Sequence, residues 1–215
     1  MTTTATDAAD AAPPTGKRGP VPPALKRFIW DIQSMVELAD SEREILVIGR
    51  DLMARLVASD DWLPEAFAVA NPGGGAQFQL YSDGLERFTV VSTILPGGAS
   101  LLIEQPSIWE IVGVLRGAIV EEPFDARAPS TGAGHSLPPP SVETRASGKG
   151  DLMRLSNALP DRVSISIHVY GGEIGKLSRR ALTPDGQAEG PPFGYANSEN
   201  APPYDILTIQ TEILD

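Results

Sequence analysis

The spacing of apolar residues predicts two amphipathic helices near the start of the chain. Between residues 22 and 38, apolar side chains recur every three or four positions, as on one face of a helix. A second periodic stretch follows Ser41, where the run Ser-Glu-Arg-Glu fits a capping box closed by Glu44. The sequence therefore predicts two N-terminal helices within residues 23–58.

From residue 77 onward the pattern changes from helical spacing to alternation. Candidate strands cover residues 77–81, 87–95, 100–104, 108–122, 142–145, 151–157 and 162–170. Short strands divided by Gly and Pro turns are typical of a barrel or a sandwich. A Pro- and Gly-rich stretch, 125–140, is expected to be a surface loop, and residues 204–214 fit either an edge strand or a short helix.

Composition limits the class of protein. A chain of 215 residues with 41% hydrophobic content predicts one domain, residues 23–215. Residues 1–22, rich in Ala, Thr, Asp and Pro, resemble a disordered tail and not a secretory signal. A formal net charge of -11 disfavours nucleic acid and anionic membrane surfaces as partners. The absence of cysteine and of a long apolar run suits a cytoplasmic protein that does not span a membrane.

Glycine and acidic residues are regularly spaced between residues 98 and 117. Gly98 is followed after five residues by Glu104, then by Pro106, by Glu110, and after six further residues by Gly117. This spacing resembles the cupin metal-binding motif, in which two histidines stand at the positions of Glu104 and Pro106. The spacing is kept here, whereas both histidines are replaced.

Several further segments, in the right order, resemble the bacterial thiol dioxygenases of the cupin superfamily. They are LPEAF, AQFQLYSDGLERFTVVSTILPGG, WEIVGVLRG, GDLMRLSN, SISIHVYGGEIG and PFGYAN. The likeness is greatest to the cysteine and 3-mercaptopropionate dioxygenase types, and among these to members with glutamine near the substrate, which Gln77 matches. The resemblance implies an all-β cupin barrel (a double-stranded β-helix, or jelly roll) over about residues 76–197. It also implies non-haem iron and a small thiol substrate.

The resemblance assigns roles residue by residue. The three histidine positions that hold iron in the family carry Glu104, Pro106 and Met153 here. Pro106 has no side-chain donor atom, and the thioether of Met153 suits copper(I) better than iron(II). The family's row of groups that orient substrate and oxygen matches Ser166, His168 and Tyr170, which are therefore the candidate catalytic residues.

An alternative metal set remains open. Glu104 and Glu110 lie six residues apart across a turn, so both could face one cavity, and with His168 they would suit Mn²⁺ or Mg²⁺. The other possibility is that both carboxylates point outward at the barrel mouth.

Three functions remain open. The first is a thiol-dioxygenase-like cupin with a degenerate metal site, a small-ligand-binding or regulatory protein that lacks normal thiol dioxygenase activity and whose ligand is a small thiol or carboxylate. The second is an oxidoreductase that uses Glu104, Glu110 and His168 as metal ligands. The third is a metal-free lyase or isomerase. Ser166 and His168 are not expected to form a hydrolase pair, because the sequence places no carboxylate behind the histidine.

Alternation along residues 162–170 predicts where the site lies. Ser166, His168 and Tyr170 share one face, and Val163, Ile165, Ile167 and Val169 share the other. A sheet covered on both sides buries both sets, so the polar row requires hydrogen-bond partners or water. We therefore expect Gln77 and the three residues to line one closed pocket, with Met153 at its wall.

Overall fold

The computed structural model describes residues 19–71, 74–124, 134–148, 151–177, 181–182, 188–189 and 194–211. Its elements are α1 (Pro23–Leu38), α2 (Glu42–Leu56), η1 (Glu65–Phe67), β1 (Ala76–Ser82), β2 (Thr89–Leu95), β3 (Ser100–Glu104), β4 (Glu110–Arg116), β5 (Ile119–Pro123), β6 (His135–Leu137), β7 (Val142–Arg145), β8 (Leu152–Asn157), β9 (Ser164–Tyr170), η2 (Ile174–Lys176), β10 (Ala181–Leu182), β11 (Ala188–Glu189) and α3 (Ile206–Thr211). In this part of the chain no helix is long and apolar enough to cross a membrane.

Strands β2 to β9 form one antiparallel ribbon that doubles back on itself. Strand β2 pairs with β9, β3 with β8, β4 with β7, and β5 with β6. The ribbon is rolled up because β4 also pairs with β9, and β5 with β8. Two sheets result, in the orders β1-β2-β9-β4-β7 and β11-β10-β3-β8-β5-β6. This is the jelly roll of the cupins, so the predicted fold class is confirmed, as two facing sheets and not a closed barrel.

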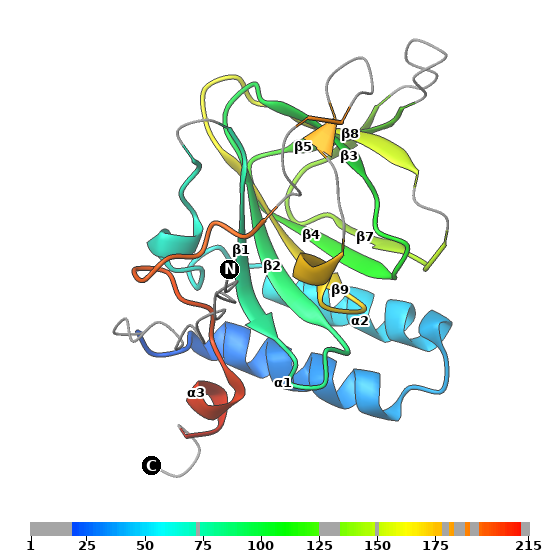
Figure 1. Ribbon diagram of the computed structural model, residues 1–215, viewed down its shortest axis with the longest axis vertical. Helices are drawn as coiled ribbons and strands as arrows, with labels where there is room; N and C mark the ends of the chain where they lie inside the picture. Colours follow the sequence, from blue (N-terminus) through cyan, green and yellow to red (C-terminus); the bar gives the residue numbers. More distant parts are fainter. Residues whose placement is uncertain are drawn as a thin grey trace, which may run out of the picture.

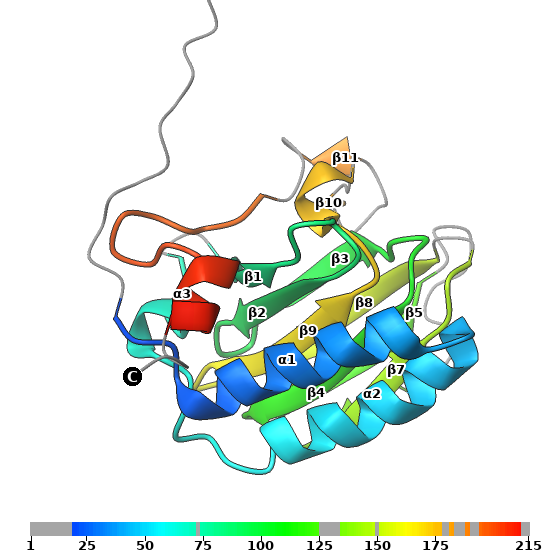
Figure 2. The ribbon, with the colours of Figure 1, turned by 90° about the horizontal axis from the view of Figure 1, so that it is seen from below.

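The two long helices cover the outer face of the five-stranded sheet (Figure 2). Side chains from both layers form one apolar core, including Ile29 of α1, Met53 of α2 and Ile167 of β9. Helix α2 lies close to the sheet at Gly113. A Cβ atom added there would be 2.6 Å from Met53 Cγ and 2.7 Å from Val57 Cγ1. The glycine is therefore required by the close approach of α2.

Both predicted helices are present, and Ser41 and Glu44 cap the start of the second, with Glu44 bonding Asp40 in place of Ser41. Ser41 Oγ accepts a hydrogen bond from the backbone N–H of Glu44 at 3.3 Å. The Glu44 carboxylate in turn accepts from the backbone N–H of Asp40 at 3.1 Å. These bonds satisfy donors that the helix start would otherwise leave unpaired.

The strand predictions differ from the structure in several places, and the short strands β10 and β11 were not predicted. The strand predicted over 108–122 is two strands, β4 and β5, because Gly117 adopts a positive φ of 78° and turns the chain. Strand β6 lies in the predicted loop 125–140, of which residues 125–133 fall outside the described part.

The chain ends also differ from the prediction. Val21 is buried in the core, so the predicted tail of residues 1–22 extends too far; its residues 1–18 lie outside the described part. For residues 204–214 the helical alternative is correct, as α3, with residues 212–214 outside the described part.

A C-terminal segment covers the edge of the five-stranded sheet (Figure 1). The N–H of Ala196 donates to the carbonyl of Gln77 at 2.7 Å, and the N–H of Tyr204 donates to that of Leu80 at 2.8 Å. Between them, the side chain of Asn197 accepts from the N–H of Gln79 at 2.8 Å. The unpaired backbone groups of β1, which would otherwise attract another strand, are thereby satisfied.

Gly113→Ala should destabilise the protein by about 1–3 kcal/mol, because the new methyl group would overlap Met53 and Val57. Urea titration followed by circular dichroism measures the change. Gly84→Ala is the matched control, since an added Cβ there meets nothing within 4 Å. Equal unfolding midpoints for the two variants would contradict the close packing of α2.

Candidate functional site

The polar row on β9 faces the space between the two sheets. Ile165, Ile167 and Val169 pack into the core under the helices, so alternation directs Ser166, His168 and Tyr170 to the opposite face. All three are buried, and His168 is only 5% exposed. The predicted division of this strand into two faces is correct.

His168 is hydrogen-bonded on both ring nitrogens. Its Nε2 lies 2.7 Å from Ser166 Oγ, and its Nδ1 lies 2.8 Å from Glu110 Oε1. The Tyr170 ring stacks on the imidazole, with its hydroxyl 3.2 Å from Nδ1. Glu110 reaches the histidine because it stands opposite Tyr170 in the β4·β9 pairing. The expectation that no carboxylate lies behind the histidine is therefore wrong.

Arg145 holds the other side of Glu110. The two residues are opposite one another in the β4·β7 pairing, and Arg145 Nη1 donates to Glu110 Oε2 at 2.8 Å. Its Nη2 donates to Glu121 on β5, in the facing sheet. One guanidinium thus joins two buried carboxylates from different sheets.

The charges of this cluster stabilise one another. Burial raises the pKa of Glu110, but the hydrogen bond from His168 and the charge of Arg145 outweigh it and lower that pKa to about 2. Burial lowers the pKa of Arg145, and the charges of Glu110 and Glu121 raise it further than burial lowers it. At neutral pH both members of the Glu110–Arg145 pair are ionised.

A second row crosses the same sheet. Gln77 Nε2 donates to Thr93 Oγ1 at 3.0 Å, and Thr93 stands directly opposite Ser166 in the β2·β9 pairing. Gln77 thus lies two strands from Ser166, or about 10 Å at ordinary strand spacing. The structure brings Gln77 to the polar face on which the sequence analysis placed it.

The opposite wall is apolar. Leu155, Leu101 and Ile103 belong to the cluster between the sheets, and Met153, paired with Ile103, shares their face. The grooves of about 450 and 320 Å³ that described residues line run along α1 and α2 and do not include these side chains. The closed pocket between Gln77, His168 and Met153 stays a prediction.

The positions expected to hold iron do not form a ligand set. Because Leu101 and Ile103 point inward, Glu104 lies on the outer face of β3, whereas Glu110 points inward. Pro106 supplies no donor atom, and Met153 offers only a thioether. Among the described residues, no three His, Asp or Glu side chains are grouped to bind a metal ion. The donors thus do not fit Fe²⁺, and Glu110 and His168 come together without Glu104.

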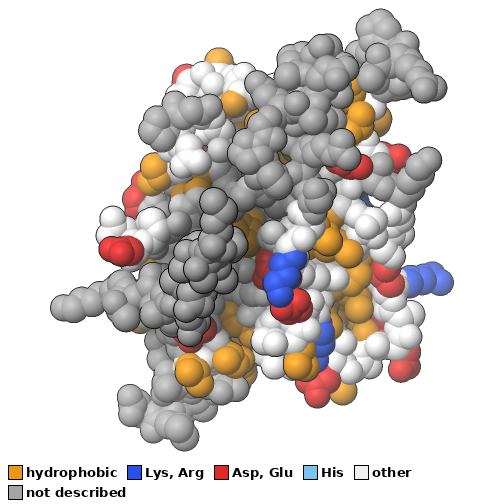
Figure 3. Space-filling model, viewed as in Figure 1, with side chains coloured by type: hydrophobic (Ala, Val, Ile, Leu, Met, Phe, Trp, Pro, Cys, Tyr) orange, Lys and Arg blue, Asp and Glu red, His pale blue; other side chains and the backbone are white. Residues whose placement is uncertain are grey.

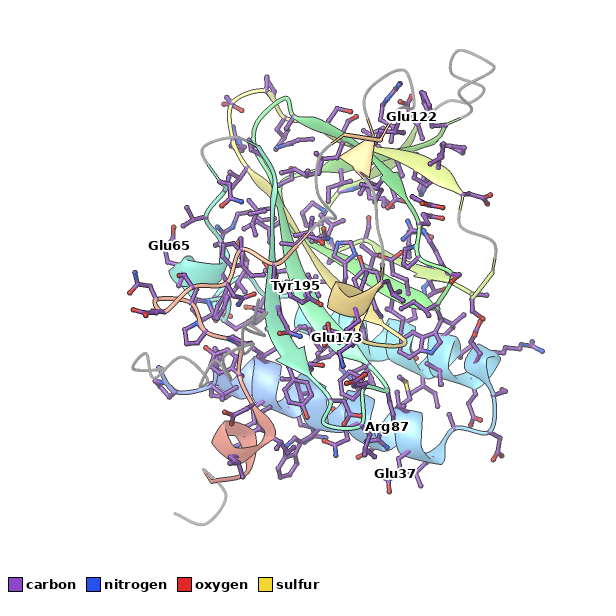
Figure 4. The ribbon with its side chains drawn as sticks, viewed as in Figure 1. Glu37, Glu65, Arg87, Glu122, Glu173 and Tyr195 are labelled. Atoms are coloured by element: carbon purple, nitrogen blue, oxygen red, sulfur yellow. The ribbon has the colours of Figure 1, made fainter. Side chains whose placement is uncertain are left out.

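A further carboxylate fixes the chain at the rim of this site. Glu173 and Tyr195 point toward one another (Figure 4), and the Tyr195 hydroxyl donates to Glu173 at 2.8 Å. Gln79 Nε2 donates to the same carboxylate at 2.9 Å, as does the hydroxyl of Ser82. Burial raises the pKa of Glu173, but the hydrogen bonds from Ser82, from Tyr195 and from the backbone N–H of Gly175 lower it below its usual value. The bonds hold η2 in place, so that Ile174 packs against Val91 and Tyr170.

Near the middle of the face that Figure 3 shows, basic side chains lie beside acidic ones. The ion pairs of the described residues include Arg87 with Asp83, at 2.8 Å, and Lys176 with Glu86. Charge in these places is paired locally.

Sequence reasoning missed Arg145, Glu121, Thr93 and Glu173. The first three stand at inward positions of their strands, and a polar or charged residue at an inward position was the available signal. The partners of these residues could not be predicted from the sequence, because contacts such as that between Glu110 and Arg145 join residues 35 apart in the chain.

No family model matches the chain. Solved structures similar to it include the Schizosaccharomyces pombe Cnp3 cupin domain, at 11% identity and a TM-score of 0.37, over 46% of this chain and 65% of that one. An oxalate oxidase matches at 12% and 0.38, over 47% and 53%. A Klebsiella pneumoniae protein with a double-stranded β-helix domain matches at 13% and 0.43, over 59% and 94%. The fold assignment rests on the strand order above.

Glu110 should make the protein sensitive to acid. Its pKa is about 2 in the folded chain against 4.5 ordinarily, so the unfolded state takes up the proton first as the pH falls. Its stabilising contribution is complete above pH 4.5 and is lost toward pH 2, with a slope of about 1.4 kcal/mol per pH unit. Urea titrations across this range should show that slope reduced in Glu110→Gln. Ser166→Ala, a neutral change in the same cluster, should keep the wild-type slope; a Glu110→Gln slope equal to wild type would refute the assignment.

Proposed function

We propose that this cupin-fold protein binds a small, uncharged polar molecule between its two sheets and does not act as an iron-dependent thiol dioxygenase. One observation carries the proposal: the groups that could ligate a metal are already bonded to each other. Both oxygens of Glu110 are used, by His168 and Arg145, and both nitrogens of His168 are used, by Ser166 and Glu110. A metal ion would have to replace these contacts.

The two walls of the interior favour an amphiphilic ligand. Gln77, Thr93 and Ser166 supply hydrogen-bonding groups on one side, and Met153 and Leu155 supply an apolar surface on the other. A small molecule with one polar end matches this division.

Charge narrows the ligand class further. Glu110 and Glu121 carry two negative charges against the single positive charge of Arg145. A carboxylate ligand would add a third negative charge to a poorly solvated interior. The sequence left small thiols and small carboxylates open as ligands. The charge of the interior favours a neutral ligand, such as a thiol that carries an amide in place of a carboxylate.

Protein purified from iron-supplemented medium should contain iron far below one equivalent after dialysis, because Glu104, Pro106 and Met153 cannot replace three imidazoles. Elemental analysis by mass spectrometry measures this. Near-stoichiometric iron would contradict the proposal, whichever residues hold it.

A neutral thiol such as 3-mercaptopropionamide should raise the melting temperature, and the rise should grow with the logarithm of its concentration. The charged 3-mercaptopropionate should raise it less. Gln77→Leu removes the polar group at one end of the row and should reduce the shift, measured by differential scanning fluorimetry.

The matched control is Arg154→Gln, on the outer face of β8, where the arginine lies 3.8 Å from Glu122. This variant should keep the full shift. The binding proposal fails if the amide gives no shift, or if Gln77→Leu responds as the wild type does.

A further inference from the structure

Ser166, His168 and Glu110 form a continuous hydrogen-bonded chain. Ser166 Oγ lies 2.7 Å from one nitrogen of the imidazole, and Glu110 Oε1 lies 2.8 Å from the other. We infer that these residues are a nucleophile, a general base and an orienting acid, and that Ser166 can be acylated by a small ester. This activity goes beyond binding, and no metal takes part in it.

The order of the three groups is the one that acyl transfer requires. An imidazole that directs its Nδ1 proton to Glu110 presents Nε2 as the acceptor for the proton of Ser166. Arg145 fixes the second oxygen of Glu110 at 2.8 Å, so the acid cannot rotate away from the histidine. Glu110 stabilises the imidazolium that forms in the reaction and stays ionised itself.

A donor for the developing oxyanion stands beside the serine. Thr93 is directly opposite Ser166 on the neighbouring strand, which places their Cβ atoms about 4.5–5.5 Å apart. In the described part of the chain, the Thr93 oxygen accepts from Gln77, so its own proton is directed elsewhere. That proton can bond a carbonyl oxygen held over Ser166, where low solvent exposure strengthens the interaction.

The reaction has two balanced halves. Ser166 Oγ attacks the ester carbonyl, its proton passes to His168 Nε2, and the tetrahedral intermediate then expels the alcohol, which takes that proton. The product is an acyl ester on Ser166. In the second half, water gives its proton to His168, its oxygen adds to the acyl carbon, and the Ser166 oxygen leaves with the proton from the imidazole.

Burial limits the substrate. Ser166 is 1% exposed, Ile174 packs over Val91 and Tyr170 nearby, and Met153 with its apolar neighbours forms the facing wall. Short acyl groups such as acetyl are therefore expected to react, and long or charged ones are not.

The test uses the full chain and p-nitrophenyl acetate as the probe. Stopped-flow absorbance should show a burst of p-nitrophenolate, and peptide mass spectrometry of the quenched protein should locate one acetyl group on Ser166. Ser166→Ala should abolish both. Ser92→Ala is the matched control, a buried serine on β2 whose hydroxyl bonds the carbonyl of Phe67 and no histidine; it should react as the wild type does.

Glu110→Gln should slow acylation by about 100-fold or more, because the imidazole loses its orienting charge. Mapping of the wild-type adduct decides the matter even if a variant fails to fold. No acetyl group on Ser166, or an equal burst in Ser166→Ala, would overturn the triad. Neither result bears on the thermal shift with 3-mercaptopropionamide, so the binding proposal is tested separately.

Discussion

The buried ion pair between Glu110 and Arg145 is the contact on which the interior of this jelly roll depends. It joins β4 to β7 within one sheet, and through Glu121 it reaches β5 in the other. Burying these charges is expensive, and the cost is offset because Arg145 bonds both carboxylates and His168 bonds the second oxygen of Glu110. Removing Arg145 alone would leave two carboxylates buried, which breaks such a cluster at a cost of about 3–5 kcal/mol. The pair also orients His168, since Arg145 holds one oxygen of Glu110 and the other oxygen bonds the imidazole.

The sequence predicted the elements well where the signal is local. Helical spacing before residue 57 and alternation on β9 depend only on which face is buried, so both are correct in the structure. The break at Gly117 was missed because residues 108–122 are apolar and β-branched on both sides of it, and one glycine was outweighed. The pairing of Glu110 with Arg145 could not be predicted, because it depends on how the ribbon of strands is rolled.

The candidate site shows the same division between local pattern and register. The row Ser166, His168 and Tyr170 was predicted to share one face, and it does. The pairing of Glu104 with Glu110 required a register across a turn, and alternation from Leu101 and Ile103 puts Glu104 outside. The side chains that share one face of a single strand can thus be predicted from the sequence. Contacts between strands or between sheets can be assigned only once the fold is known.

Two rows of polar side chains meet at Ser166. One runs across β1, β2 and β9 through Gln77 and Thr93, and the other runs from Arg145 through Glu110 and His168. The first consists of neutral hydrogen-bonding groups, which suit recognition of a ligand. The second places the charged carboxylate of Glu110 beside the imidazole of His168, which suits the transfer of a proton. Because the charged residues do not include Gln77 or Thr93, substitution at Glu110 should impair reactivity and leave the neutral hydrogen-bonding groups in place.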